Sequence, residues 1–109
     1  YNYVVRIPSE DGRMEIIAYV FVRIFANKMH IMRIAVAQDF KSHGVATRLL
    51  RQCLKLAEEK SADAVLIEVR PTNKSAIGLY RSAGFELQGT RPSYYPDSGE
   101  DALLMVKHL

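Results

Sequence analysis

Hydrophobic and polar residues recur with two different periods along the chain, and the change of period divides it into elements. In the first third, β-branched and aromatic residues are interrupted by turn-forming residues around Gly12 and Asn27, which is typical of strands joined by hairpins. This pattern predicts three antiparallel strands, at residues 2–7, 15–25 and 29–37.

The period then changes to that of amphipathic helices. From Val45 to about residue 60, apolar positions recur at helical spacing with charged residues opposite them. Residues 64–70 read as a short buried strand that Pro71 stops. Thr72 or Asn73 can cap a second helix, which runs to residue 83 and is closed by Gly84. A last pair of strands is expected at 85–89 and 103–107, around a loop at 92–100.

This order of elements predicts an α/β (α+β) fold with a mixed central sheet flanked by helices. A right-handed crossover makes the strands at 31–37 and 64–70 near neighbours. Ligands collect at the carboxyl ends of strands in open sheets of this kind. Glu68 lies at such an end, so this edge of the sheet is the expected site.

A glycine-containing loop leads from the third strand into the first helix. Its residues, with the first two of the helix, are Lys41, Ser42, His43, Gly44, Val45 and Ala46. A helix N-terminus leaves backbone N–H groups unpaired, and nothing acidic caps this one, so the loop can hold a phosphate. The alternative is a plain strand-to-helix turn that uses Gly44 for its backbone angles. Neither the Walker A pattern nor the dinucleotide-binding pattern of glycines is present.

Glu68 interrupts an otherwise apolar strand, so its carboxylate should be partly desolvated, as is typical of a general base. The alternative is that Glu68 forms an ion pair with Arg70, two residues along on the same face, or lies on a solvated face.

Composition limits the possible functions. The chain has 109 residues, enough for one domain, and a net charge of +3 from scattered Lys and Arg that favours an anionic ligand without indicating nucleic acid. No apolar run is long enough to cross a membrane. The single cysteine, Cys53, fits a reducing compartment such as the cytoplasm and reads as a buried thiol. The three histidines, His30, His43 and His108, lack the spacing of metal ligands, so no metal is expected.

Four motifs follow one another in the later part of the chain. They are residues 41–46; residues 66–70 followed by Asn73, Ala76, Leu79, Tyr80 and residues 84–85; Tyr94, Tyr95 and Pro96; and residues 99–102 with Met105. In this order they resemble the GNAT superfamily of acetyl-CoA-dependent N-acetyltransferases, and most closely its RimI-type N-terminal protein acetyltransferases. The first motif is similar to the superfamily's acetyl-CoA loop, R/Q-x-x-G-x-G/A. The resemblance covers residues 34–109 well and the opening strands loosely.

The resemblance implies how the cofactor, acetyl-CoA, is bound. Backbone N–H groups of residues 41–46 would hold the pyrophosphate. The strand before them, with Ile34, Ala35 and Val36, would pair with the pantetheine, and Asn73 would approach the cofactor. From spacing alone, Asn73 is more often a helix cap, and both roles are compatible.

The resemblance also implies catalytic and acceptor-binding residues. Glu68 falls on the RimI-type general base and Tyr80 on the general acid, while Tyr94 and Tyr95 would lie on the hairpin that covers the peptide entry groove. Spacing alone instead favours Tyr80 as a core residue and leaves Tyr94 and Tyr95 as an ordinary aromatic strand end.

The sequence departs from the family at two places. Lys41 stands where Arg or Gln is usual, which keeps a cationic or polar group in a loop that works through its backbone. Family members begin with a strand and two helices that have no counterpart before residue 2. We therefore expect residues 1–109 to be a single GNAT domain that is short at its N-terminus. The strand and two helices are then upstream, are supplied by another chain, or are lacking, and in the last case the acceptor site is open.

The resulting hypothesis is an enzyme that acetylates a protein N-terminal α-amine, of a ribosomal protein, by direct transfer in a ternary complex. The alternatives are acetylation of a small amine such as a polyamine or an amino sugar, and a non-catalytic acyl-CoA-binding module. Neither nucleic acid nor a membrane is an expected partner, and an exposed sheet edge is compatible with a dimer.

Overall fold

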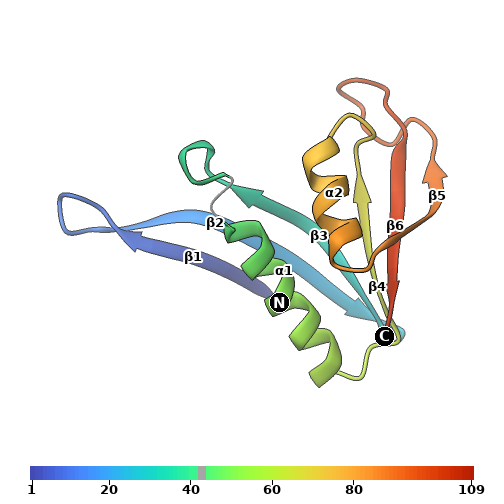
Figure 1. The fold of residues 1–109 in the computed structure, drawn as a ribbon, viewed down its shortest axis with the longest axis horizontal. Helices are drawn as coiled ribbons and strands as arrows, with labels where there is room; N and C mark the ends of the chain where they lie inside the picture. Colours follow the sequence, from blue (N-terminus) through green and yellow to red (C-terminus); the bar gives the residue numbers. More distant parts are fainter. Residues whose placement is uncertain (42–43) are drawn as a thin grey trace.

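One mixed sheet of six strands carries two α-helices in the computed structural model, which describes residues 1–41 and 44–109 (Figure 1). The elements are β1 (Asn2–Pro8), β2 (Met14–Phe25), β3 (Lys28–Val36), the 3₁₀ helix η1 (Gln38–Phe40), α1 (Val45–Glu59), β4 (Ala64–Val69), α2 (Lys74–Ser82), β5 (Glu86–Arg91) and β6 (Ala102–His108). The strand order is β1-β2-β3-β4-β6-β5. The pairing of β3 with β4 is parallel, and the other pairings are antiparallel.

The predicted fold class and strand neighbours are confirmed, and element bounds agree to within about two residues. Two details were not predicted: the short helix η1, and the extension of β5 to Arg91, which pairs with Ala102 at the start of β6. Over the described ranges 1–41 and 44–109, neither α-helix has the length and apolar character that crossing a bilayer requires.

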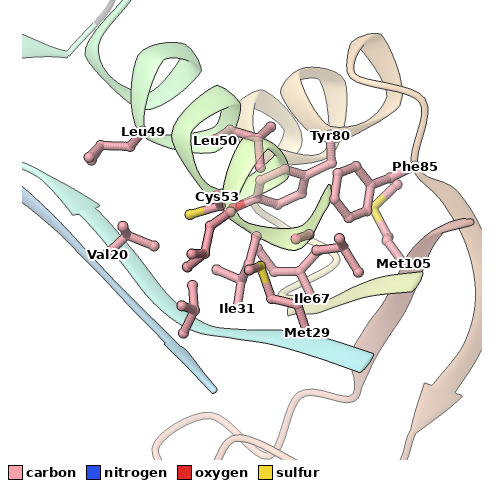
Figure 2. Close-up of a cluster of buried hydrophobic side chains, with 14 of the residues drawn as sticks. Val20, Met29, Ile31, Leu49, Leu50, Cys53, Ile67, Tyr80, Phe85 and Met105 are labelled. Atoms are coloured by element: carbon pink, nitrogen blue, oxygen red, sulfur yellow. The ribbon is translucent and has the colours of Figure 1, made fainter. Parts of the chain in front are cut away.

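Both helices pack on one face of the sheet, and the core lies between them and the strands (Figure 2). The apolar face of α1 is buried because Leu50, Cys53 and their neighbours at helical spacing point toward the sheet. Met29 and Ile31 of β3 belong to the same buried cluster and are almost fully buried. Burial raises the pKa of the Cys53 thiol to about 11, so this thiol stays protonated at neutral pH, as expected for a core cysteine.

Strands β3 and β4 separate before either of them ends. Their last paired residues are Ile31 and Ile67, although β3 continues to Val36 and β4 to Val69. On the other side of β3, Phe21 of β2 faces Arg33 and Val22 faces Ile31, which leaves Met32 unpaired in the pattern of a β-bulge. A bulge bends the strand that carries it, and Figure 1 shows β3 diverging from β4 with the start of α2 beside the opening.

Truncation of a core side chain tests this packing. Leu50→Ala should lower the free energy of unfolding by about 2–5 kcal/mol, because Leu50 is 1% exposed and its removal leaves a cavity between α1 and the sheet. Urea denaturation followed by circular dichroism measures the change. Leu87→Ala on exposed β5 is the control, with an expected change below about 1 kcal/mol. Equal losses in the two variants would contradict the packing described here.

Candidate functional site

The opening between β3 and β4 holds two adjoining cavities. The first has a volume of about 520 Å³ and lies between the end of β3, the start of α1 and the start of α2. It is lined by Ile34, Ala35, Val36, Phe40, Lys41, Gly44, Val45, Ala46, Thr47, Asn73, Ser75, Ala76, Leu79 and Tyr80. All the predicted cofactor-binding residues that the structure describes are therefore gathered around one space, and Ser42 and His43 lie outside the described residues.

Among the described residues, no side chain caps the start of helix α1 at this cavity. Its N-cap residue is Gly44, which has no side chain that could cap the helix. No acidic residue occupies the first turn. The first N–H groups of an α-helix have no partner within the helix and carry partial positive charge. Since residues 1–41 and 44–109 supply no side-chain cap, this helix start has the features that are typical of anion-binding helix ends.

Gly44 is required by its backbone conformation. Its φ is 78°, in the left-handed region that residues with a Cβ rarely adopt. Apart from its chain neighbours, no described residue has an atom within 4 Å of the place where a Cβ would be. The turn and the phosphate-binding interpretations of this loop are thus compatible with each other.

The second cavity has a volume of about 430 Å³ and lies between the diverging ends of β3 and β4. It is lined by Ile31, Met32, Arg33, Ile34, Ile67, Glu68, Val69, Arg70, Asn73, Tyr80 and Tyr95. Three residues, Ile34, Asn73 and Tyr80, line both cavities. The two spaces therefore meet at these three side chains.

Asn73 sits at this junction as the N-cap of α2. Its Oδ1 accepts a hydrogen bond from the backbone N–H of Ala76 at 3.3 Å and another from the Ser75 hydroxyl at 3.3 Å. The predicted capping role is confirmed. Because Asn73 also borders both cavities, its predicted approach to a cofactor remains compatible with the cap.

Glu68 lies in the second cavity with a side chain that is only 6% exposed. His30 Nε2 lies 3.4 Å from its Oε2, and Arg91 Nε lies 3.3 Å from its Oε1. Among the described residues, Oε1 has no hydrogen-bond partner despite its burial. The contact with Arg91 is an ion pair without hydrogen-bond geometry, so Oε1 keeps the capacity to accept a hydrogen bond from a ligand.

The alternative interpretation of Glu68, an ion pair with Arg70, is wrong. Arg70 instead turns toward the loop between β5 and β6, where Asp97 and Glu100 lie 3.0 and 3.3 Å from its guanidinium nitrogens. Residues two apart on a strand share a face, but β4 ends at Val69, so Arg70 is no longer held on the face of Glu68. Two carboxylates distant in sequence take its place as partners.

Tyr80 combines a core position with a place at the site. Its ring is buried in the core cluster against Phe85, with centroids 5.9 Å apart. The same residue lines both cavities, at the junction described above. Burial, and to a lesser extent the neighbouring Tyr95, raises the pKa of Tyr80 to about 12. Tyr80 therefore holds its phenolic proton at neutral pH and can donate it.

Tyr94 and Tyr95 form an edge-to-face pair with ring centroids 5.0 Å apart. Tyr95 lines the second cavity. The Glu68 carboxylate, followed by partial burial, raises the pKa of Tyr94. Tyr95 therefore shares a cavity with Glu68, while Tyr94 packs against Tyr95 and lines neither cavity.

Several residues at the site were not identified from the sequence pattern. His30 and Arg91 flank Glu68, and Arg33 and Met32 line the second cavity. His30 pairs in register with Leu66, two residues before Glu68, so the correct register would have revealed it. Arg91 comes from β5, which lies next to β6 and not next to β4, so no local pattern indicates it.

Comparison with known proteins gives one family. The model of the acetyltransferase (GNAT) family matches residues 3–85. An N-alpha-acetyltransferase from Sulfolobus acidocaldarius is 40% identical over an alignment of 112 residues, covering 91% of this chain and 66% of that protein. The ribosomal protein bS18-alanine N-acetyltransferase of Escherichia coli K12 is 31% identical over 100 residues, covering 90% of this chain and 66% of that protein. This chain thus spans about two thirds of the length of these curated relatives.

A solved structure shows the same fold. A GNAT family acetyltransferase from Elizabethkingia anophelis, crystallised with acetyl-CoA bound, aligns with a TM-score of 0.81 and 22% sequence identity. The alignment covers 87% of this chain and 70% of that one.

The protonation of Tyr80 can be tested by absorbance. At pH 10.5 a tyrosine with the usual pKa near 10 is about three-quarters ionised, whereas Tyr80 should remain almost wholly protonated. Wild type and Tyr80→Phe should therefore show the same phenolate absorbance at 295 nm at this pH, with circular dichroism confirming that both are folded. A deficit of most of one phenolate in the variant would contradict the burial of the hydroxyl.

Proposed function

We propose that this chain, which belongs to the GNAT family of acetyltransferases, transfers an acetyl group from acetyl-CoA to the α-amine of a protein N-terminus. The observation that carries the proposal is the meeting of two cavities at Ile34, Asn73 and Tyr80. One cavity offers an uncapped helix end, and the other offers a buried carboxylate. A donor in one cavity and an acceptor in the other can therefore meet at these three residues. Residues 1–109 form one domain in this proposal.

The first cavity fits acetyl-CoA. The uncapped start of α1 at Gly44, Val45 and Ala46 suits the pyrophosphate, with Lys41 adding cationic charge. Between Ile34 and Val36, β3 pairs with β2 on one edge only, so backbone groups on the other edge are free to hold the amide-containing pantetheine. Acetyl-CoA bound there supplies a thioester whose acetyl group can pass to an amine.

Glu68 is the proposed general base. An α-ammonium group has a pKa near 7.7–8.0, so it has to lose only a weakly held proton before the amine can attack. Oε1 of Glu68, which has no hydrogen-bond partner among the described residues, can receive that proton directly or through water. The contacts with His30 and Arg91 hold the carboxylate in position.

Tyr80 is the proposed general acid. It holds its proton at neutral pH and lies where the two cavities meet. A phenol in this position can donate a proton to the sulfur on which negative charge develops. The transfer is proposed to be direct, in a ternary complex, because the buried and protonated Cys53 is a poor acyl carrier.

The second cavity favours a peptide acceptor over a small polycation. Arg33 and Arg70 line it together with Glu68, so the lining carries more cationic than anionic groups. A site for a polyamine would be acidic. The tyrosine pair offers ring faces and hydroxyls that can grip an extended main chain. The name of the Escherichia coli relative makes a ribosomal protein our preferred acceptor, and the single free cysteine is consistent with a cytoplasmic reaction.

Two matched peptides test the proposal. One has a free α-amine and no lysine, and the other has a blocked N-terminus and one lysine. Wild type should acetylate the first, and Glu68→Gln and Tyr80→Phe should each lower kcat/KM by a factor of about 10²–10⁴, because each removes a proton-transfer group. Mass spectrometry of the peptide products measures the rates.

Glu86→Gln and Tyr3→Phe are the controls, since these residues lie on the outer strands β5 and β1 and line neither cavity. Their rates should stay within about twofold of wild type, the range expected for surface substitutions. Preferential acetylation of the lysine peptide would overturn the N-terminal assignment. Binding of acetyl-CoA without transfer to either peptide or to a polyamine would favour a non-catalytic module.

A further inference from the structure

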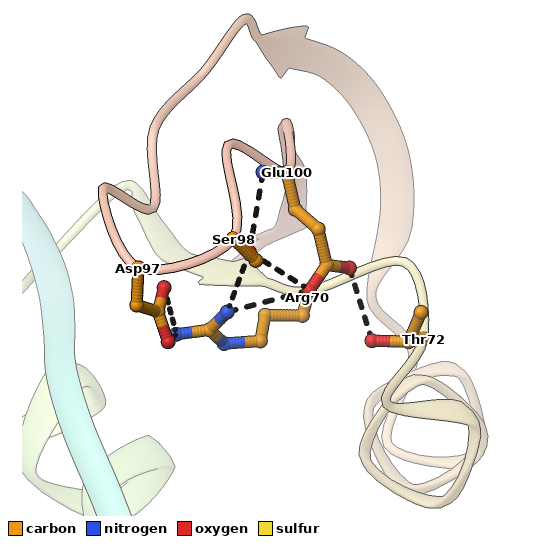
Figure 3. Close-up of polar contacts among 5 residues, drawn as sticks. All are labelled: Arg70, Thr72, Asp97, Ser98 and Glu100. Atoms are coloured by element: carbon orange, nitrogen blue, oxygen red, sulfur yellow. Dashed lines mark hydrogen bonds and ion pairs between the residues drawn. The ribbon is translucent and has the colours of Figure 1, made fainter.

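Arg70, just after the end of β4, makes the densest set of polar contacts in the described part of the chain (Figure 3). One terminal nitrogen donates to both carboxylate oxygens of Asp97 at 3.0 Å. The other donates to the Ser98 hydroxyl at 3.1 Å and to Glu100 Oε1 at 3.3 Å. The guanidinium is therefore committed to the loop between β5 and β6, more than 25 residues away in sequence.

A second residue of the β4–α2 connection joins the same loop. The Thr72 hydroxyl donates to Glu100 Oε2 at 3.0 Å, so both oxygens of Glu100 are held from this connection. Hydrogen bonding to Arg70 lowers the pKa of Asp97, and hydrogen bonds from Thr72, Ser98 and Arg70 lower that of Glu100. Both carboxylates therefore stay charged at neutral pH. We call Arg70, Thr72, Asp97, Ser98 and Glu100 the Arg70 cluster.

The Arg70 cluster is connected to the acceptor cavity through Tyr95. The Arg70 guanidinium carbon lies 4.0 Å from the centre of the Tyr95 ring, a cation–π distance. The backbone N–H of Tyr95 donates to the Glu100 carbonyl at 3.2 Å, and that of Gly99 donates to the Tyr95 carbonyl at 2.8 Å. Residues 95–100 thus form a closed turn, whose acidic end is held by Arg70 and whose aromatic end lines the second cavity.

This loop has little else to hold it in place. Most of residues 92–101 are exposed, and Tyr95 and Glu100 are half-buried. Exposed ion pairs contribute little to global stability, but they can decide the position of a loop that buries little apolar surface. Loss of the Arg70 cluster should therefore release the loop while the rest of the protein stays folded.

We propose that Arg70 is a positioning residue, which holds the 95–100 turn so that Tyr95 forms one wall of the acceptor cavity. Affinity for the acceptor main chain then depends on Asp97 and Glu100, which do not line that cavity, as well as on Arg70, which does. The inference rests on the proposed function, because the acceptor it concerns is the N-terminal peptide.

Steady-state kinetics of three variants test the role. Arg70→Ala and the double variant Asp97→Asn/Glu100→Gln should each raise the KM for the α-amine peptide by about 10-fold or more, the effect expected from losing charged hydrogen bonds. The KM for acetyl-CoA, kcat and Tm should change little. Combining all three substitutions should add little to either effect alone, because they remove the same cluster. Arg51→Ala, on the exposed face of α1, is the matched arginine control.

The outcomes separate the alternatives. A raised peptide KM in Arg70→Ala with an unchanged one in Asp97→Asn/Glu100→Gln would mean that Arg70 contacts the acceptor itself, and would overturn the positioning role. A parallel rise in the KM for acetyl-CoA with a large loss of Tm would show a merely structural role and would overturn it too.

Amide hydrogen exchange gives a readout that needs no acceptor. In Arg70→Ala, exchange should accelerate in residues 95–100 and stay unchanged in α1 and the core strands. Unchanged exchange in the turn would overturn the inference whatever the acceptor is. If wild type transfers nothing to the peptide while the turn still loosens in the variant, the proposed function fails and the positioning of the turn by Arg70 stands.

Discussion

The arrangement of the site depends on the early end of the pairing between β3 and β4. These strands share hydrogen bonds only as far as Ile31 and Ile67, and Met32 bulges from β3 at the next position. Without this divergence the sheet would be continuous and would offer its ligands only the surface beyond its strand ends. With it, a strand edge, two helix starts and a buried carboxylate border one gap, which is how a fold of only six strands and two α-helices holds two adjoining cavities.

Charged side chains around this gap have separate tasks. Arg91 and His30 hold the buried side chain of Glu68, whose Oε1 has no hydrogen-bond partner among the described residues. Arg70 holds the loop that carries the tyrosine pair. Burying a carboxylate is costly unless charged or polar partners accompany it, so the contacts with Arg91 and His30 explain why Glu68 is tolerated in a nearly apolar strand. The missing hydrogen bond at Oε1 is the feature that packing alone leaves unexplained.

Sequence reasoning predicted most of the fold because the local signals and the final structure agree. The alternation in β1–β3, the helical spacing around Leu50, the Asn73 cap and the positive φ at Gly44 each depend on neighbours within a few residues. The site was predicted in part, through the motifs that resemble a family. Structure places Glu68, Tyr80, Tyr95 and the described cofactor residues around two adjoining cavities, while their roles remain proposals.

The features that were missed depend on contacts distant in sequence. The bulge at Met32 follows from the register with β2, and the contact of Arg91 with Glu68 needs the order β4-β6-β5. The alternative pairing of Glu68 with Arg70 was wrong because the end of a strand frees its side chain for partners elsewhere. Neither a residue's type nor its spacing contains this information.

The central claim is that donor and acceptor occupy two spaces that meet at Tyr80. Coenzyme A joined through an acetyl bridge to the α-amine of a peptide would span both, and isothermal titration calorimetry can compare it with coenzyme A alone. The joined molecule should bind about 100-fold tighter than coenzyme A or better, because two binding events become one. Equal affinity for the two molecules, or a greater gain when the bridge is attached to a lysine side chain, would contradict this claim.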